Sequence, residues 1–336
     1  MLAILLMVAM LLPACTPAVP DCSQLMVFCA GLVTDGGRVD DLSFNQAAWE
    51  GIQQAERERL VQWSSYIETV DSRDYEENIS TFAEAGYDVI VTVGSSLGPA
   101  TSSASVEYPG IYFIGLEQFQ ETGAELPNLA GLVFPEDQAG FLAGALAAAM
   151  SGTGQVGAVL GSNDYPPVGR YGEGFLAGAE YFDPEIEADV AYNNTADFEK
   201  ASHDPKWGAV AANDMIDVGV DVIFGVGQTG DGALLAAARR GIYVIGAEVD
   251  QYYLLPKAAP LLLSSVVKLV EPAVVELIGL ARVESFPEGN FYGIYGYAPF
   301  HDLDSKVPAE VKVRLEEIIQ GLQAGLIETG VSPAEP

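Results

Sequence analysis

The sequence has few basic residues and few histidines, and each shortage excludes a class of function. Its 336 residues include 15 lysines and arginines against 47 aspartates and glutamates, a formal net charge of −32. A surface of that sign repels phosphate, which excludes nucleic-acid polymers and anionic membrane surfaces as partners. The two histidines, His203 and His301, lie far apart, with no Cys or His at ligand spacing. We therefore expect no metal site.

The apolar run at the N-terminus, residues 1–12, is too short to span a bilayer, which needs about 20 residues. Its length and composition suit the apolar core of a secretory signal. The following Leu-Pro-Ala-Cys at residues 12–15 resembles a bacterial lipobox, and the proline-containing stretch after it is typical of a tether. Residues 1–24 are thus predicted to be a lipoprotein signal and tether. Lipidation at Cys15 would anchor the protein to the cell membrane, facing out of the cytoplasm, and the anchor would be its sole contact with that membrane.

Two of the three cysteines remain, Cys22 and Cys29, and we predict that they are not joined. In an extended chain the seven-residue step between them covers about 23 Å, far beyond the Cα separation of a disulfide. Cys29 lies inside the apolar run of residues 25–33, where a small buried hydrophobic side chain is expected.

Beyond residue 24, strand-like and helix-like segments alternate. A helix is predicted over residues 46–56, and Ser43 with Gln46 predicts a capping box at its start. Apolar runs of strand length, alternating with helical patterns, indicate parallel sheets buried on both faces. The other predicted helices cover residues 139–150, 232–240 and 307–326, and the predicted strands cover residues 25–33, 87–93, 110–115, 154–160, 220–224 and 242–245.

The two halves of the chain repeat one arrangement. Residues 87–95 and 220–228 are each an apolar strand followed by a glycine-containing loop. A short strand follows each of them and ends beside an acid, Glu117 in the first half and Glu248 in the second. Two similar α/β lobes are the simplest interpretation, with residues 129–134 as a crossover between them.

Residues 33–51 lie where a predicted strand hands over to a helix, the position at which open α/β sheets bind ligands. Asp35 is expected to project from the strand end. Phe44 and Asn45 follow in the first helical turn, and they offer an aromatic face beside an amide able to bond the edge of a heterocycle.

This segment resembles the signature of the basic membrane protein family, which includes purine nucleoside receptor lipoproteins. The resemblance implies a type I periplasmic-binding-protein fold, in which two Rossmann-like lobes on a three-strand hinge hold a ligand in the cleft. The expected limits are 25–134 plus 268–289 for the first lobe and 135–267 plus 290–331 for the second. Similar blocks follow in order at residues 128–148, 168–178, 246–251, 263–268 and 297–302.

The resemblance also implies a function, the capture of a nucleoside for an ABC permease by a monomeric binding protein that is not an enzyme and needs no cofactor. Phe44 would stack on the base, and carboxylates one methylene longer than the family's aspartates, Glu117 and Glu248, would bind the sugar hydroxyls. The second stacking ring is left open between Phe198, slightly favoured, and Trp207. The full set of expected ligand-binding residues is Asp35, Phe44, Asn45, Ser95, Glu117, Phe198, Trp207, Gly227, Gly230, Glu248, Asp250 and Lys268.

Other functions suit parts of the same pattern. A sugar or small polyol would also suit a cleft of aromatic rings and acids. The Gly-x-Gly-x-x-Gly at residues 225–230 matches a dinucleotide fingerprint, with Glu248 about twenty residues on, so an NAD-dependent oxidoreductase is a less favoured alternative. A nucleoside hydrolase with Ca²⁺ on Asp35, Asp40 and Asp41 is a third. A helix N-terminus already accounts for Asp40 and Asp41.

Overall fold

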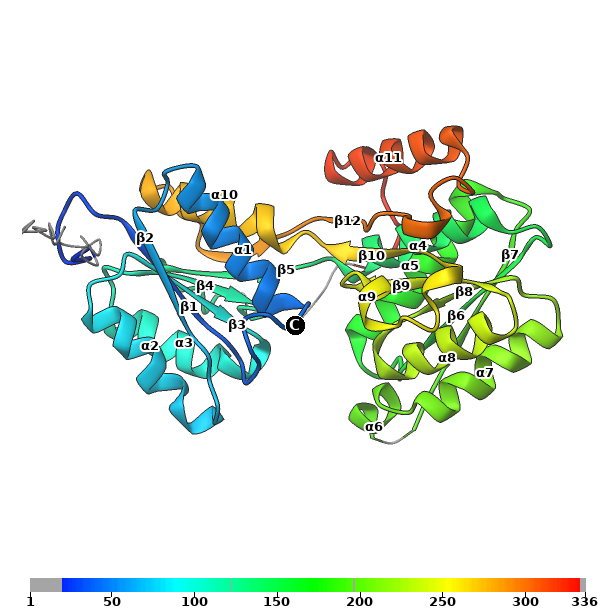
Figure 1. Cartoon of the computed structure of the whole chain (residues 1–336), viewed down its shortest axis with the longest axis horizontal. Helices are drawn as coiled ribbons and strands as arrows, with labels where there is room; N and C mark the ends of the chain where they lie inside the picture. Colours follow the sequence, from blue (N-terminus) through cyan, green and yellow to red (C-terminus); the bar gives the residue numbers. More distant parts are fainter. Residues whose placement is uncertain (1–19, 122, 196, 333–336) are drawn as a thin grey trace, which may run out of the picture.

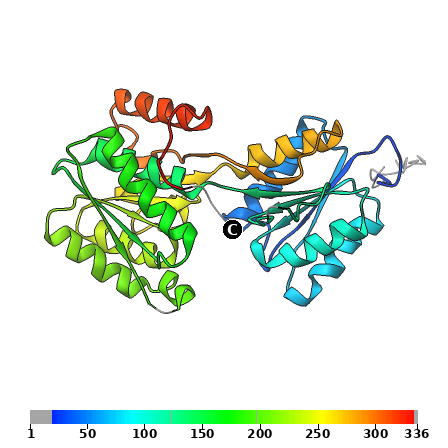
Figure 2. The ribbon, with the colours of Figure 1, turned by 180° about the vertical axis from the view of Figure 1, so that it is seen from behind.

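The structure is a computed structural model that describes residues 20–121, 123–195 and 197–332. It contains two six-stranded sheets, each with helices on both faces, joined by a narrow waist (Figure 1). The same two lobes are seen from behind in Figure 2. The predicted α/β architecture of two similar lobes is confirmed.

The first sheet is entirely parallel, in the order β11-β5-β4-β3-β1-β2. Its central strands are buried along their whole length, because helices cover both faces. The edge strand β2 is polar and half-exposed. It lacks the continuous apolar run on which the strand predictions depended, so it was not predicted. The strands are β1 (Cys29–Val33), β2 (Trp63–Ile67), β3 (Val89–Val93), β4 (Tyr112–Leu116), β5 (Leu129–Val133) and β11 (Gly289–Tyr292).

The second sheet has the order β12-β10-β9-β8-β6-β7, and all its pairs are parallel except that of β12 with β10. The five strands from β10 to β7 are parallel to one another, as in the first sheet, so their carboxyl ends again share one edge. The strands are β6 (Gln155–Leu160), β7 (Glu187–Tyr192), β8 (Val222–Gly225), β9 (Tyr243–Glu248), β10 (Leu262–Lys268) and β12 (Tyr295–Tyr297).

Helices pack in pairs on these sheets. In the first lobe α1 (Phe44–Arg57) packs against α10 (Val270–Arg282), and α2 (Tyr75–Glu84) packs against α3 (Gly98–Glu107). In the second lobe the pairs are α4 (Glu136–Met150) with α5 (Pro166–Phe182), and α7 (Pro205–Asp217) with α8 (Gly227–Arg239). The short α6 (Phe198–Ser202) and α9 (Gln251–Leu254) lie in loops, and α11 (Ala309–Gln323) lies over α4 (Figure 1).

Three segments cross between the lobes: β5 to α4, β10 to α10, and β11 to β12. The predicted limits differ from these strands at two places. Lys268 ends β10 and pairs with Tyr295 in the second sheet, although we had expected it to begin a first-lobe segment. Residues 290–292 belong to β11 in the first sheet, because Asn290 pairs with Gly131 there, although we had expected them in the second lobe.

The prediction for Cys22 and Cys29 is wrong: they form a disulfide, with Cα atoms 5.8 Å apart. The assumption of an extended chain failed, because the segment between them folds into consecutive turns. The backbone N–H of Gln24 donates to the carbonyl of Asp21, and that of Val27 donates to the carbonyl of Gln24. Only residues 29–33 of the predicted strand are therefore extended.

The predicted capping box at α1 is also wrong. The Ser43 side chain makes no capping bond. Instead Asp41 Oδ1 accepts from the backbone N–H groups of Ser43 and Gln46, and the Gln46 side chain accepts from the N–H of Leu42. Asp41, two residues before Ser43, therefore caps the helix. The helix dipole also favours a negative charge at this end.

Within the described residues, no helix combines the length and the apolar character needed to cross a membrane. Cys15, the predicted lipidation site, lies outside the described residues.

Candidate functional site

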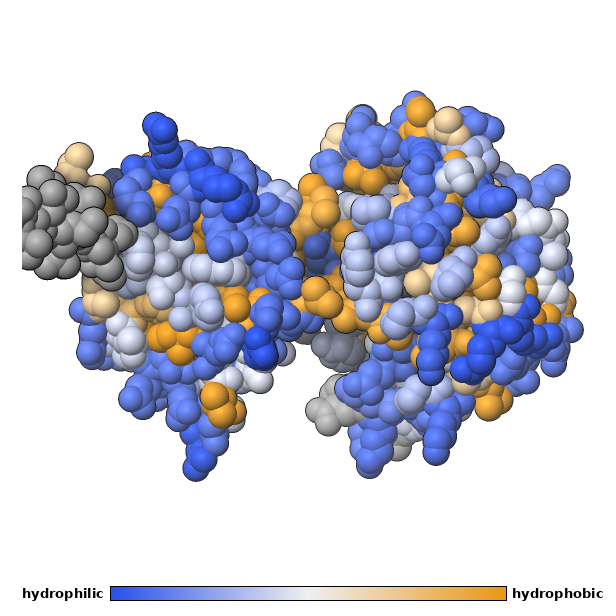
Figure 3. All heavy atoms as spheres, viewed as in Figure 1, coloured by the Kyte–Doolittle hydropathy of each residue, from blue (hydrophilic) through white to orange (hydrophobic). Residues whose placement is uncertain are grey.

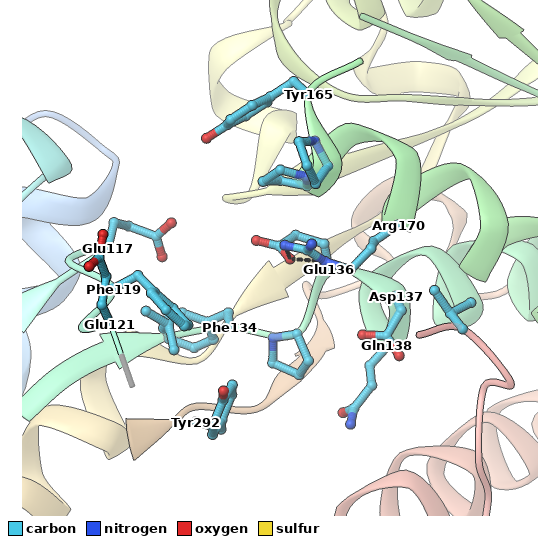
Figure 4. A pocket seen from close by; sticks show the side chains of 15 residues that line it. Glu117, Phe119, Glu121, Phe134, Glu136, Asp137, Gln138, Tyr165, Arg170 and Tyr292 are labelled. Carbon is cyan, nitrogen blue, oxygen red and sulfur yellow. Dashed lines mark hydrogen bonds and ion pairs between the residues drawn. The ribbon is translucent and has the colours of Figure 1, made fainter. Parts of the chain in front are cut away.

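The surface is hollowed between the two lobes (Figure 3). At the hinge side of this hollow lies a cavity of about 600 Å³, which we call the hinge pocket. It draws residues from both lobes and from the C-terminal segment (Figure 4). Its lining consists of Glu117, Phe119, Glu121, Val133, Phe134, Pro135, Glu136, Asp137, Gln138, Tyr165, Pro166, Pro167, Arg170, Tyr292 and Val331.

Lys268 lies between the lobes and binds a carboxylate from each. Its Nζ is 3.0 Å from Oε2 of Glu117, at the end of β4, and 3.4 Å from Oε1 of Glu248, at the end of β9. The lysine side chain is 3% exposed. Burying its charge would destabilise the fold if the two carboxylates were absent. Three of the expected ligand-binding residues thus meet at one point, although they are far apart in the sequence.

Both glutamates adopt the left-handed backbone conformation, with φ of 61° at Glu117 and 70° at Glu248. Non-glycine residues seldom adopt it, and where they do a functional constraint is common. The bend directs each carboxylate away from its strand and toward Lys268.

The electrostatics of this triad favour a charged lysine. Burial opposes the charge on Lys268, but Glu248 and then Glu117 outweigh it, and the pKa of the ammonium is raised. Burial raises the pKa of Glu117, while Lys268 acts in the opposite direction. Oε1 of Glu117 is enclosed and has no hydrogen-bond partner among the described residues.

Two aromatic rings cover the lysine. Its Nζ is 5.0 Å from the centroid of Phe44 and 5.8 Å from that of Phe134, both within the range of cation–π attraction. Phe44, the expected stacking residue, therefore forms part of the same cluster as the triad.

The first-lobe wall is an amide held by two carboxylates. Asn45 donates through Nδ2 to Asp35 Oδ1 at 3.2 Å and to Asp41 Oδ2 at 3.0 Å. Both N–H groups of the amide are therefore used. Its oxygen, Oδ1, is buried and has no described partner. Tyr75 fixes this corner from below, because its hydroxyl donates to the backbone carbonyl of Asp35.

The second-lobe wall carries Gln251 and Asp231 beside Glu248. The backbone N–H of Gln251 donates to Ser265 Oγ at 3.0 Å, which ties this loop to β10. Burial raises the pKa of Asp231; a bond from the Gln251 side chain partly offsets this, and Glu248 adds to it. Oε1 of Gln251 is buried without a described partner. Each wall thus contains a buried amide oxygen that has no described partner.

Asp250 is already engaged. Its Oδ2 lies 2.8 Å from Nε2 of His301, and its Oδ1 caps α9 by accepting from the N–H of Tyr252. The His301 ring stacks on Tyr252 with centroids 4.0 Å apart. Asp250 therefore shapes the loop that carries Glu248 and Gln251.

The remaining expected residues lie outside the triad, in turns and helices. Ser95 is exposed at the start of a 3₁₀ turn after β3. Gly227, with φ of 67°, opens α8, and Gly230 packs against the backbone of Gly225. Trp207 is partly buried and packs against the core of the second lobe, and Phe198 begins α6.

Four residues of the hinge pocket were not among the expected ligand-binding residues: Phe134, Glu136, Tyr165 and Arg170. Arg170 donates to Glu136 Oε2 through Nε at 3.0 Å and a terminal nitrogen at 2.8 Å, and both side chains are largely buried. They come together because α4 and α5 start side by side, which no local pattern reveals. Among the described residues no cluster of His, Cys, Asp and Glu is arranged to hold a metal ion.

Known proteins resemble this chain in sequence and in fold. A "CD4+ T-cell-stimulating antigen" of Listeria monocytogenes is 31% identical, covering 91% of this chain and 89% of its own length. The "ABC transporter nucleoside-binding protein BmpA" of Lactococcus lactis is 27% identical over 77% of this chain and 76% of its own. A solute-binding protein of an ABC transporter system from Conexibacter woesei, 19% identical, superposes with a TM-score of 0.72 over 90% of this chain and 98% of its own.

These likenesses agree with the two-lobed periplasmic-binding-protein fold, and the family they indicate consists of solute-binding proteins, which are not enzymes. The glycine motif at residues 225–230 therefore opens α8 as a structural turn. Residues 29–295 match the family described as "ABC transporter substrate-binding protein PnrA-like", known as Bmp. The chain belongs to this Bmp family of ABC transporter substrate-binding proteins.

Proposed function

We propose that the protein binds a nucleoside in the cleft between its lobes and delivers it to an ABC permease. The observation that carries the proposal is the cluster around Lys268, to which each lobe contributes a carboxylate and Phe44 contributes a ring face. Carboxylates accept two hydroxyl bonds, as the vicinal hydroxyls of a ribose require. The similar protein of Lactococcus lactis is named as nucleoside-binding, which supports the same class of ligand.

The mechanism is binding without a chemical step. A ligand that contacts both walls, near Asn45 on one and near Gln251 on the other, gains both sets of contacts only when the lobes are close. Ligand then favours the closed form by its differential affinity for it. The closed shape is what the permease would recognise in a monomeric binding protein.

We further propose that Cys15 is lipidated and that the protein lies at the outer face of the cell membrane. The membrane-bound fraction would be lost in a Cys15→Ser variant. Mass spectrometry of the mature N-terminus would show a diacylated cysteine, and an unmodified Cys15 in membrane-extracted protein would contradict the assignment.

Titration calorimetry with a panel of nucleosides, free bases and ribose tests the ligand. We expect nucleosides to bind and Phe44→Ala to weaken them at least tenfold, about 1.4 kcal/mol. Phe182→Ala is the matched control, because Phe182 also faces a cation, Arg314 at 3.9 Å, but lies at the far end of α5. Equal affinity in Phe44→Ala and the native protein would sink base stacking. Binding of ribose as tight as that of any nucleoside would favour a sugar or polyol ligand instead.

A further inference from the structure

The hinge pocket has more aromatic surface than the proposed nucleoside site uses. Phe119 is 37% exposed, Tyr165 44% and Tyr292 54%, although rings of this size are normally buried. All three line one concave surface, two from the first lobe and Tyr165 from the second. Phe134 forms the floor between them (Figure 4).

Tyr165 is placed to act across the cleft. It immediately precedes α5, whose first two residues, Pro166 and Pro167, restrict the backbone there. Its side chain points toward Glu117 from the opposite lobe (Figure 4). Burial, and then the charges of Glu136 and Glu117, raise the pKa of Tyr165, so the phenol remains a hydrogen-bond donor.

The charges of the pocket select against anions. Glu117, Glu121, Glu136 and Asp137 line it, and Arg170 is the one basic side chain in its described lining. Arg170 is already paired with Glu136, with both side chains at most 14% exposed. A negatively charged ligand would meet unbalanced carboxylates, whereas an N–H donor would find acceptors in the carboxylates of the lining.

The volume is also suitable. A cavity of about 600 Å³ falls within the range of about 300–1,000 Å³ found for small-molecule sites. It touches the Lys268 cluster through Glu117, which belongs to both. A ligand group in the hinge pocket would therefore continue directly from one bound at the triad.

We propose that the hinge pocket is a second ligand compartment, which takes a flat, uncharged or cationic group bearing N–H donors, and that Tyr165 closes over this group from the second lobe. This inference rests on the proposed function in one respect: it assigns to the bound nucleoside-like ligand a second flat moiety beyond Glu117. It places Tyr165 among the residues that determine ligand specificity.

Three probes of one shape test the compartment without a nucleoside: benzamidine, benzamide and benzoate. Ligand-observed saturation-transfer NMR on the full chain would report binding at millimolar concentration. We expect benzamidine and benzamide to bind and benzoate not to bind. In Tyr165→Ala the affinity for benzamidine should fall at least fivefold. Tyr181→Ala is the matched control, because Tyr181 lies on α5, the helix that Tyr165 precedes, is 48% exposed and does not line the pocket.

Phe119→Ala gives a second variant in the other lobe, in case Tyr165→Ala does not fold, and it should also lose benzamidine affinity. Equal binding of benzoate, or undiminished benzamidine binding in both pocket variants, would overturn the compartment. Adenosine in parallel separates the two proposals. The compartment stands and the nucleoside assignment fails if the probe pattern holds but no nucleoside binds. The reverse result, nucleosides bound but no benzamidine, overturns the compartment alone.

Discussion

Glu117 and Glu248 occupy equivalent places in the two lobes, and both reach the same lysine. Each lies at the carboxyl end of a parallel strand, each has a left-handed backbone, and their carboxylates lie 3.0 and 3.4 Å from Lys268 Nζ. The repeat of the α/β lobe thus brings two like charges to the hinge, and one cation from β10 neutralises part of that charge. The relative position of the lobes depends on this cation.

Replacing Lys268 by Met should therefore destabilise the protein strongly. The change leaves two partly buried carboxylates facing each other, and breaking a buried pair in this way costs about 3 kcal/mol or more. The free energy of unfolding, measured by denaturant titration, would show the loss.

Lys312→Met is the control for that variant. Lys312 also pairs with a carboxylate, Asp304 at 2.6 Å, and also lies over a ring, Phe300 at 5.4 Å, but it is 31% exposed. Its loss should cost less than about 1 kcal/mol. Equal effects of the two substitutions would refute the special role of Lys268.

The contact between α4 and α5 should be intolerant of any added methyl group. A Cβ at Gly144 would lie 2.0 Å from the carbonyl oxygen of Phe175, a backbone atom that cannot move aside. Gly144→Ala should reduce stability by about 3 kcal/mol, as overpacking does.

Gly279→Ala provides the comparison in α10. There a Cβ would meet only the tip of Leu60, at 3.8 Å. This variant should gain about 0.5 kcal/mol, since Ala suits a helix interior better than Gly. Thermal unfolding of both variants tests the pair, and a stable Gly144→Ala protein would show that the helices can separate.

Asp231→Asn should change the pH dependence of stability. Burial raises the pKa of Asp231 in the folded state. The stability that goes with its protonated form is present below the ordinary pKa of 3.8 and is lost as pH rises through the raised value. The Asn variant should therefore unfold at a higher temperature than the native protein at pH 7, with the difference shrinking toward pH 3. A constant difference across that range would contradict the argument.

Much of the fold was predictable because its signals are local. The buried strands β3 and β8 are largely apolar runs, and α1 has an apolar stripe, so each of these elements can be predicted from its own residues. Edge strands such as β2 and β7 are half polar and escaped notice.

Within the site, the two glutamates could be named because they lie at the ends of predicted strands, and Lys268 because it matches a family motif, but their mutual contact depends on how the lobes pack. Tyr165 and Arg170 gave no signal, since only the pairing of α4 with α5 brings them to the hinge. The disulfide was missed for a similar reason. Its geometry depends on turns within residues 21–27 that contain neither Gly nor Pro.

Removing the disulfide by the double change Cys22→Ala and Cys29→Ala should lower stability by about 2 kcal/mol, because the unfolded chain regains the freedom of the closed loop. Ligand affinity should not change, since Cys29 begins β1 and Asp35 lies past the other end of that strand. Calorimetric unfolding and ligand titration of the double variant measure the two quantities. A loss of affinity would contradict this separation.

The position of that disulfide has a mechanical consequence. It ties the N-terminal segment to the amino end of β1, whose carboxyl end faces Asp35 and the cleft. A pulling force on the N-terminal segment would therefore act on the first lobe, at the start of β1. The second lobe is joined to the first through the three hinge segments and the contact of Lys268 with Glu117, and the disulfide does not restrain it.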